Sequence, residues 1–140
     1  MKILLIQGAN MEALGKRDPA LYGTITAAEL DAYLIAQNPG DQLDIRYTNT
    51  EGQAIDWIYE AERGDVEGLL MNPAGFLHAG YALRDCLEII SMPYVEVHMT
   101  NIDRRKFHSV TATAADGMIA GLGVESYMLG LSALRKLVTA

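Results

Sequence analysis

The sequence predicts an α/β protein, with a flavodoxin-like, doubly wound sheet of five parallel strands in the order 2-1-3-4-5. Short apolar runs alternate along the chain with stretches of helical periodicity. The runs are continuously apolar, which is typical of parallel strands that helices cover on both faces. The length of 140 residues suits one domain, and no repeat or linker interrupts the pattern. We therefore expect a single domain over residues 1–140.

The expected strands and helices alternate along the chain. The strands are predicted at Lys2–Gln7, Gln42–Thr48, Glu67–Met71, Tyr94–Met99 and Gly117–Ala120. The helices are predicted at Ala27–Gln37, Gly52–Arg63, Tyr81–Ile90 and Glu125–Val138. Thr26 and Glu29 have the spacing of a capping box, which marks the start of the first helix. Asn38-Pro39-Gly40 is expected to end that helix.

One connection is longer than such a fold needs. The chain from Gly8 to Thr24 joins the first strand to the first helix and contains Gly15, Pro19 and Gly23. Compact α/β units usually make this connection in about 2–6 residues. We interpret the segment as a lid or binding loop.

Composition restricts the partners that the protein can have. The net charge is −7, which argues against nucleic acid or an anionic membrane as a main partner. A small anionic substrate would need positive contacts that are local. The sequence has neither an apolar stretch of membrane-spanning length nor the charge order of a signal peptide. The one cysteine, Cys86, excludes an internal disulfide, suits a reducing cytoplasm and is expected in the core.

Polar residues follow the three central strands of the predicted sheet. They are Asn10 after the first strand, Asn72 and His78 after the third, and Glu96 and His98 in the fourth. Ligands of open parallel sheets bind outside the carboxyl ends of the strands. These residues come from distant parts of the sequence, and the fold is expected to bring them to one crevice.

Glu96 and His98 form the strongest pair in this set. Alternate residues of a strand point to the same face, so the carboxylate is expected beside the imidazole. It would then hold one tautomer and favour the protonated form that a general acid needs. Asn10 or Asn72, taken alone, is more often part of a turn or a helix cap, and a lone histidine is more often structural.

The long loop carries Lys16, Arg17 and Tyr22. An unperturbed tyrosine has a pKa of about 10 and is a poor base at neutral pH. An arginine within reach favours the phenolate. The alternative is an exposed tyrosine beside a solvated basic pair, and the loop taken by itself favours that alternative.

The chain lacks the common motifs for cofactors and metals. Gly8 and Gly15 match neither the dinucleotide fingerprint nor the P-loop. His78, His98 and His108 lack the spacing of a zinc site. There is no nucleophile elbow, and the serines lie in no recognisable nucleophile setting. We therefore expect no cofactor and no metal.

In five blocks the sequence resembles the type II 3-dehydroquinate dehydratases, also called type II dehydroquinases. The blocks are Gly8–Gly23, Asn49–Ile58, Asn72–Asp85, Glu96–Asn101 and Gly117–Tyr127. They follow in order over nearly the whole chain, and the spacing is most specific in GANMEALGKRDPALYG and EVHMTN. The resemblance implies a lyase that dehydrates 3-dehydroquinate to 3-dehydroshikimate without a metal or a Schiff base.

The resemblance also implies a role for each catalytic residue. Tyr22, activated by Arg17, would remove a proton alpha to the ketone. A water held by Asn10 would stabilise the resulting enolate. His98, oriented by Glu96, would then protonate the departing hydroxyl.

The family binding residues correspond to further positions of this chain. Asn72 and His78 would hold ring hydroxyls, and backbone amides from Met99 and Thr100 onward would hold the carboxylate. Asp85 corresponds to a residue that acts across a subunit contact. The implied state is a homo-oligomer, a dodecamer built as a tetramer of trimers. The role in aromatic amino acid biosynthesis or in quinate catabolism stays open.

The sequence departs from the family around His78 and between Asn101 and Ser109. Leu77 and Ala79 flank His78 where the family commonly has hydroxyl residues, and the second segment is shorter than usual.

The second departure removes the arginine that directly follows a phenylalanine in the family. Phe107 is followed by His108 here, and Arg105 or Arg104 is the candidate to reach the same place. The alternatives are therefore a family paralogue acting on a related hydroxylated cyclic keto-acid, or a non-catalytic binding or assembly protein that keeps the fold. A flavin carrier is disfavoured because no phosphate-cradling loop is present.

Overall fold

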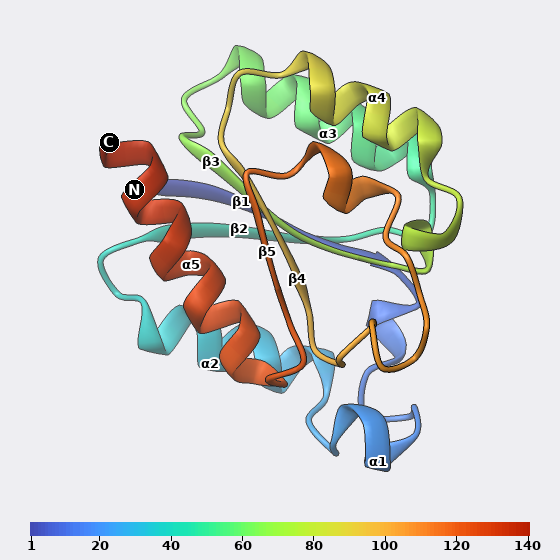
Figure 1. Ribbon diagram of the computed structural model, residues 1–140. Coiled ribbons are helices and arrows are strands. Elements are labelled where there is room, and N and C mark those ends of the chain that lie inside the picture. Colours follow the sequence, from blue (N-terminus) through green and yellow to red (C-terminus); the bar gives the residue numbers. More distant parts are fainter.

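A computed structural model describes all residues, 1–140, and contains one parallel sheet in the order β2-β1-β3-β4-β5 (Figure 1). The strands are β1 (Lys2–Ala9), β2 (Gln42–Tyr47), β3 (Gly68–Ala74), β4 (Tyr94–His98) and β5 (Gly117–Ala120). Every neighbouring pair is parallel. The predicted strand order and α/β class are confirmed, and each strand lies within a few residues of its predicted range.

The central and edge strands differ in burial. β1, β3 and β4 are buried along nearly their whole length, as their continuous apolar runs predict. β2 and β5 expose part of their residues. The expectation of full cover on both faces is therefore wrong for these two, because the helices pack mainly against the central strands.

Two layers of helices cover the sheet, one on each face (Figure 1). The helices are α1 (Pro19–Tyr22), α2 (Ala27–Gln37), α3 (Glu51–Arg63), α4 (Tyr81–Ile89) and α5 (Val124–Thr139). α2 and α5 bury leucines against one face of β1, β3 and β4. α3 and α4 cover the other face, and Cys86 of α4 is buried there as expected. Each fully buried leucine contributes roughly 1.5–3 kcal/mol.

Helix α5 lies very close to the sheet at Gly130. A Cβ atom at this position would lie 2.6 Å from Cγ1 of Val97 and 2.8 Å from Cδ1 of Leu70. The absence of a side chain therefore lets α5 approach β4 directly. This approach brings the first turns of α5 to the strand ends where the site lies.

The start of α2 confirms the predicted capping box. The Thr26 hydroxyl accepts a hydrogen bond from the Glu29 backbone, and the Glu29 carboxylate accepts one from the Thr26 backbone. The long connection before it is more ordered than the sequence indicated. It contains a 3-10 turn (Met11–Ala13) and α1, which Asp18 caps by accepting from the Ala20 backbone.

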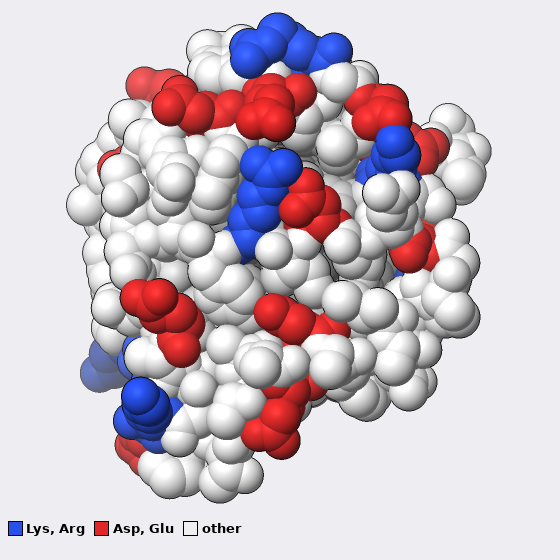
Figure 2. All heavy atoms as spheres, turned by 180° about the vertical axis from the view of Figure 1, so that it is seen from behind, with Lys and Arg blue, Asp and Glu red and all other residues white.

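Charge is spread over the surface in a mixed pattern. Figure 2 shows acidic side chains in several separate groups on one face, with basic side chains between them. This pattern agrees with the net charge of −7. No helix of the chain combines the length and apolar character that crossing a membrane requires.

Candidate active site

A cavity of about 250 Å³ opens at the carboxyl ends of β1, β3 and β4. Its walls include most of the residues that the sequence singled out: Asn10, Arg17, Tyr22, Asn72, His78, His98, Met99, Thr100 and Arg105. The predicted convergence at these strand ends is therefore present. Two arginines and no carboxylate line the cavity. A protein of net negative charge thus presents local positive groups there, as an anionic ligand requires.

The lid helix α1 places Tyr22 at the cavity. Nη2 of Arg17 donates a 2.9 Å hydrogen bond to Oη of Tyr22, and its guanidinium lies 4.1 Å from the centre of the tyrosine ring. The two residues are five apart in the sequence. The loop that the sequence left ambiguous therefore holds a tyrosine paired with a cation, not an isolated surface side chain.

Arg105 is a second cation on the same oxygen. Its Nη1 donates to Oη of Tyr22 at 2.8 Å and to Oγ1 of Thr100 at 3.1 Å. The guanidinium lies 4.6 Å from the centre of the Phe107 ring, and that ring meets His78 edge to face at 4.8 Å. Of the two arginines that the sequence offered, Arg105 is thus the one that lines this cavity, and Arg104 does not.

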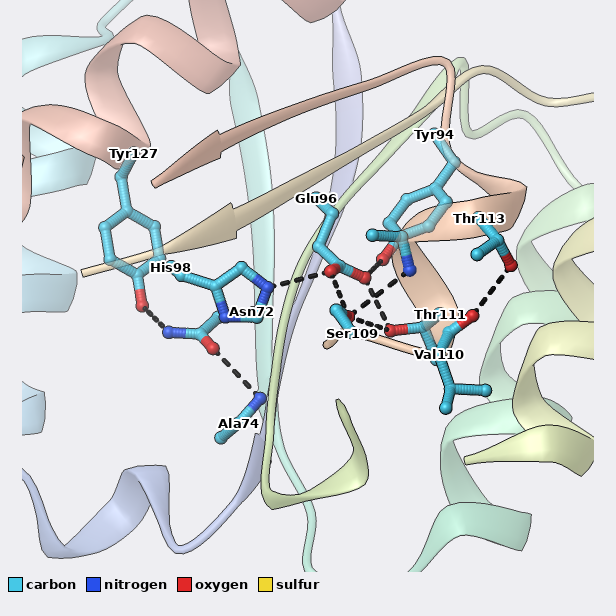
Figure 3. A network of polar contacts seen from close by, with 11 residues as sticks. Asn72, Ala74, Tyr94, Glu96, His98, Ser109, Val110, Thr111, Thr113 and Tyr127 are labelled. Carbon is cyan, nitrogen blue, oxygen red and sulfur yellow. Dashed lines mark hydrogen bonds and ion pairs between the residues drawn. The ribbon is translucent and has the colours of Figure 1, made fainter. Parts of the chain in front are cut away.

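Glu96 lies behind the cavity and holds His98. Oε2 of Glu96 is 2.8 Å from Nε2 of His98, so Nδ1 is the ring nitrogen left for a ligand. Glu96 also accepts 2.5 Å hydrogen bonds from the hydroxyls of Tyr94, Ser109 and Thr111 (Figure 3). The carboxylate is fully buried. Four donors thus surround one buried charge.

These donors decide the ionisation of Glu96. Burial by itself raises the pKa of the carboxyl. The hydrogen bonds from His98, Ser109, Thr111 and Tyr94 act in the opposite direction and together bring the pKa below its ordinary value. Glu96 is therefore a carboxylate at neutral pH, as the orientation of His98 requires.

Sequence reasoning missed three of the four donors. The sequence did indicate that Tyr94 could contact Glu96, because alternate residues of β4 point to the same face and Tyr94 shares that face with Glu96 and His98. No sequence pattern indicated Ser109 and Thr111, since they lie in the connection before β5 and their partner lies on β4.

Asn10 stands at the end of β1 in a left-handed conformation, with φ of 71°. Asparagine tolerates this conformation better than most residues. Oδ1 of Asn49 accepts the Asn10 backbone N–H at 2.8 Å, and Nδ2 of Asn49 donates to Glu12 at 2.8 Å. The Asn49 side chain thus fixes the turn that presents Asn10 to the cavity.

Asn72 lies at the cavity wall, whereas Asp85 lies on the surface away from the cavity. Asn72 is buried at the cavity wall, with Oδ1 accepting from the Ala74 backbone at 3.0 Å and Nδ2 donating to Tyr127 at 2.9 Å. Asp85 is exposed on α4, is 3.6 Å from Arg84 and does not line the cavity. Its predicted role across a subunit contact stays a prediction.

Comparison with known proteins gives one consistent result. A protein-family model described as dehydroquinase class II matches residues 1–135. The 3-dehydroquinate dehydratase of Halalkalibacterium halodurans is 44% identical over 137 residues, covering 94% of each chain. That of Leptothrix cholodnii is 43% identical, covering 100% of this chain and 97% of the relative.

A solved structure agrees with these relatives. The type II dehydroquinase of Butyrivibrio crossotus superposes with a TM-score of 0.92 at 31% identity. The match covers 96% of this chain and 97% of that one.

Proposed function

The chain belongs to the dehydroquinase class II family, and from this premise we propose that it dehydrates 3-dehydroquinate to 3-dehydroshikimate through an enolate. The observation that carries the proposal is the pair of guanidinium groups on one phenol oxygen, with 2.9 Å from Arg17 and 2.8 Å from Arg105. Two charge-assisted donors stabilise a phenolate more than a neutral phenol. They make Tyr22 the base of the site.

In the first step, Oη of Tyr22 takes the proton alpha to the ketone, and the electron pair of the broken C–H bond forms the enolate. Asn10 holds a water that donates to the enolate oxygen. This role is supported by the fixed turn around Asn10, where the side chain lines the cavity.

In the second step, the enolate collapses to the enone and the ring hydroxyl departs. His98 gives its proton to the leaving oxygen, so that water is released. Glu96 supports this role because its carboxylate lies 2.8 Å from Nε2 of His98 and holds the imidazole at the cavity. The cycle is completed when Tyr22 loses its extra proton and His98 regains one, either by transfer from Tyr22 to His98 or by exchange of both groups with solvent.

Binding is assigned to the cavity wall. Asn72 and His78 hold ring hydroxyls, and backbone amides from Met99 and Thr100 onward hold the carboxylate. No lysine lines the cavity, which supports a reaction without a Schiff base. Nowhere in the chain do three or more His, Cys, Asp or Glu side chains gather as a metal site would need.

A direct assay tests this function. Enone absorbance is followed with purified protein and 3-dehydroquinate, and Tyr22→Phe is expected to lower kcat by about 10²–10⁴-fold because the base is removed. Tyr33→Phe is the matched control, since Tyr33 is exposed on α2 and does not line the cavity. Wild-type protein without turnover, or full activity of Tyr22→Phe, would contradict the proposal.

A second candidate substrate is a related hydroxylated cyclic keto-acid. Leu77 and Phe107 line the cavity and present apolar surface to a ligand. A ring hydroxyl facing such surface without a partner costs roughly 1–3 kcal/mol. This candidate is favoured if the protein turns over an analogue with one hydroxyl fewer at a higher kcat/KM than 3-dehydroquinate.

A further inference from the structure

We propose that Tyr127 is a positioning residue, which together with the Ala74 N–H holds the Asn72 amide so that one of its N–H groups is available to the ring substrate. The inference rests on the proposed function, because it concerns how the same cavity holds a hydroxylated ring. Tyr127 lies near the start of α5, outside the cavity wall. It acts only through Asn72.

The contacts are made by three buried groups on three elements. Gln7 of β1 and Asn72 of β3 are direct partners in the parallel register, and the Tyr127 hydroxyl bridges their side chains. Nδ2 of Asn72 donates to Oη of Tyr127 at 2.9 Å, and Oη donates to Oε1 of Gln7 at 2.8 Å. The exposed fractions are 0% for Gln7, 4% for Asn72 and 0% for Tyr127. Water therefore cannot replace either bond at low cost.

A single backbone group determines the direction of this chain of bonds. The N–H of Ala74 can only donate, so the side-chain atom of Asn72 that it meets at 3.0 Å must be the carbonyl oxygen (Figure 3). Nδ2 is consequently turned toward Tyr127, whose oxygen accepts and whose hydrogen passes to Gln7. Ala74 itself has a φ of 49°, a conformation unusual for alanine. The Asn72 carbonyl therefore also holds a strained turn of the cavity wall.

The second hydrogen of Nδ2 is the one that a ligand can use. Its only other neighbour of acceptor type is Sδ of Met11 at 3.6 Å, and a thioether is a weak acceptor. Met11 and Asn72 both line the cavity. A ring hydroxyl is a better acceptor than the sulfur and would take this N–H. Tyr127 thus keeps the amide in the one orientation that offers a donor there.

The orientation is kept although it leaves one donor unused. Nε2 of Gln7 is buried without a hydrogen-bond acceptor. An orphaned buried donor is uncommon and costs stability. The Gln7 side chain is thus held by its carbonyl oxygen, which accepts from Oη of Tyr127.

The test is Tyr127→Phe, which removes the hydroxyl and keeps the ring. The expected result is a rise of about tenfold in KM for 3-dehydroquinate with kcat changed less than about twofold, since one orienting bond is lost and the proton-transfer groups are untouched. Tyr33→Phe is the control. Tyr33 is exposed on α2, and its hydroxyl makes no hydrogen bond to Asn72 or to Gln7, so KM should stay unchanged.

Two further measurements separate positioning from loss of structure. In an Asn72→Ala background, Tyr127→Phe should leave KM unchanged, because there is no amide to orient. The two side-chain N–H signals of Asn72 in a ¹⁵N NMR spectrum should move in Tyr127→Phe and stay in Tyr33→Phe. Equal KM for Tyr127→Phe and wild type, or additive effects in the double variant, would overturn the inference. If wild-type protein shows no turnover, the proposed function fails, and unchanged Asn72 signals in Tyr127→Phe would then overturn the inference on their own.

Discussion

The cavity residues fall into those that face the ligand and those that hold them. Tyr22 receives hydrogen bonds from two arginines, one five residues away in sequence and one 83 residues away. Glu96 likewise has two donors that are two residues away and others 13 and 15 residues away. At the scale of single residues, each charged or reactive group thus combines a local contact with contacts that only folding supplies.

Arg105→Gln is expected to lower kcat/KM by about 10–100-fold. The change removes a charge-assisted hydrogen bond to Tyr22, which is worth roughly 1.5–3 kcal/mol. The enone assay on purified variants measures the effect. Arg104→Gln is the control, because this neighbouring arginine does not line the cavity. Equal losses of kcat/KM in the two variants would contradict a specific role for Arg105, because removal of either positive charge would then have the same effect.

Thr111→Val is expected to reduce the free energy of unfolding by about 1–3 kcal/mol at pH 7, because one of the four donors to buried Glu96 is lost. The folded-state pKa of Glu96 is lowered, so its stabilisation is present above the pKa of the unfolded state and fades as pH falls through the lower folded value. The difference between variant and wild type should therefore shrink in acid. Urea unfolding at several pH values measures it, and a pH-independent difference would contradict this account.

At the scale of elements, the loop after β1 decides which side chains reach the strand ends. The loop contains a short helix, α1, and Gly23 follows this helix directly with φ of 70° and ψ of −163°. That region is close to exclusive to glycine. The N–H of Gly23 donates to the Pro19 carbonyl and closes the turn that presents Tyr22.

Gly23→Ala is expected to lower kcat/KM at least about fivefold. A Cβ here would meet nothing within 4 Å, so the cost is the backbone strain alone, roughly 1–3 kcal/mol, and it acts on the lid. Gly40→Ala is the control, since its Cβ is equally free and its φ is not in the left-handed range. A fall in Tm without a kinetic change would place the strain in the core instead.

At the scale of the whole molecule, one proposed site residue lies away from the cavity of its own chain. Asp85 is on the exposed side of α4, where it and Glu88 are 3.6 and 3.7 Å from Arg84. Its role therefore depends on a second copy of the chain, and we propose a homo-oligomer, with a dodecamer as the expected size.

Asp85→Asn is expected to lower kcat/KM about tenfold or more, because a charge that completes the neighbouring site is removed. Glu88→Gln makes the same chemical change beside the same arginine and should be close to neutral. Light scattering of the wild-type protein gives the oligomer size. A monomer with full activity, or equal behaviour of the two variants, would contradict the assembly.

The sequence by itself determined the strand order, the main helices and the strand ends at which polar residues meet. Hydrophobic periodicity and strand-end chemistry are local signals, so they were readable for Asn10, Asn72, His78 and His98. The roles of Arg17, Tyr22, Met99 and Thr100 came from the family resemblance. Only the tertiary structure decided three contacts. Arg105 and Arg17 both donate to the Tyr22 hydroxyl, Ser109 and Thr111 donate to the Glu96 carboxylate, and Tyr127 accepts from the Asn72 amide. These contacts join residues from separate elements, and their geometry depends on how loops close and how closely α5 approaches the sheet, which no local pattern records.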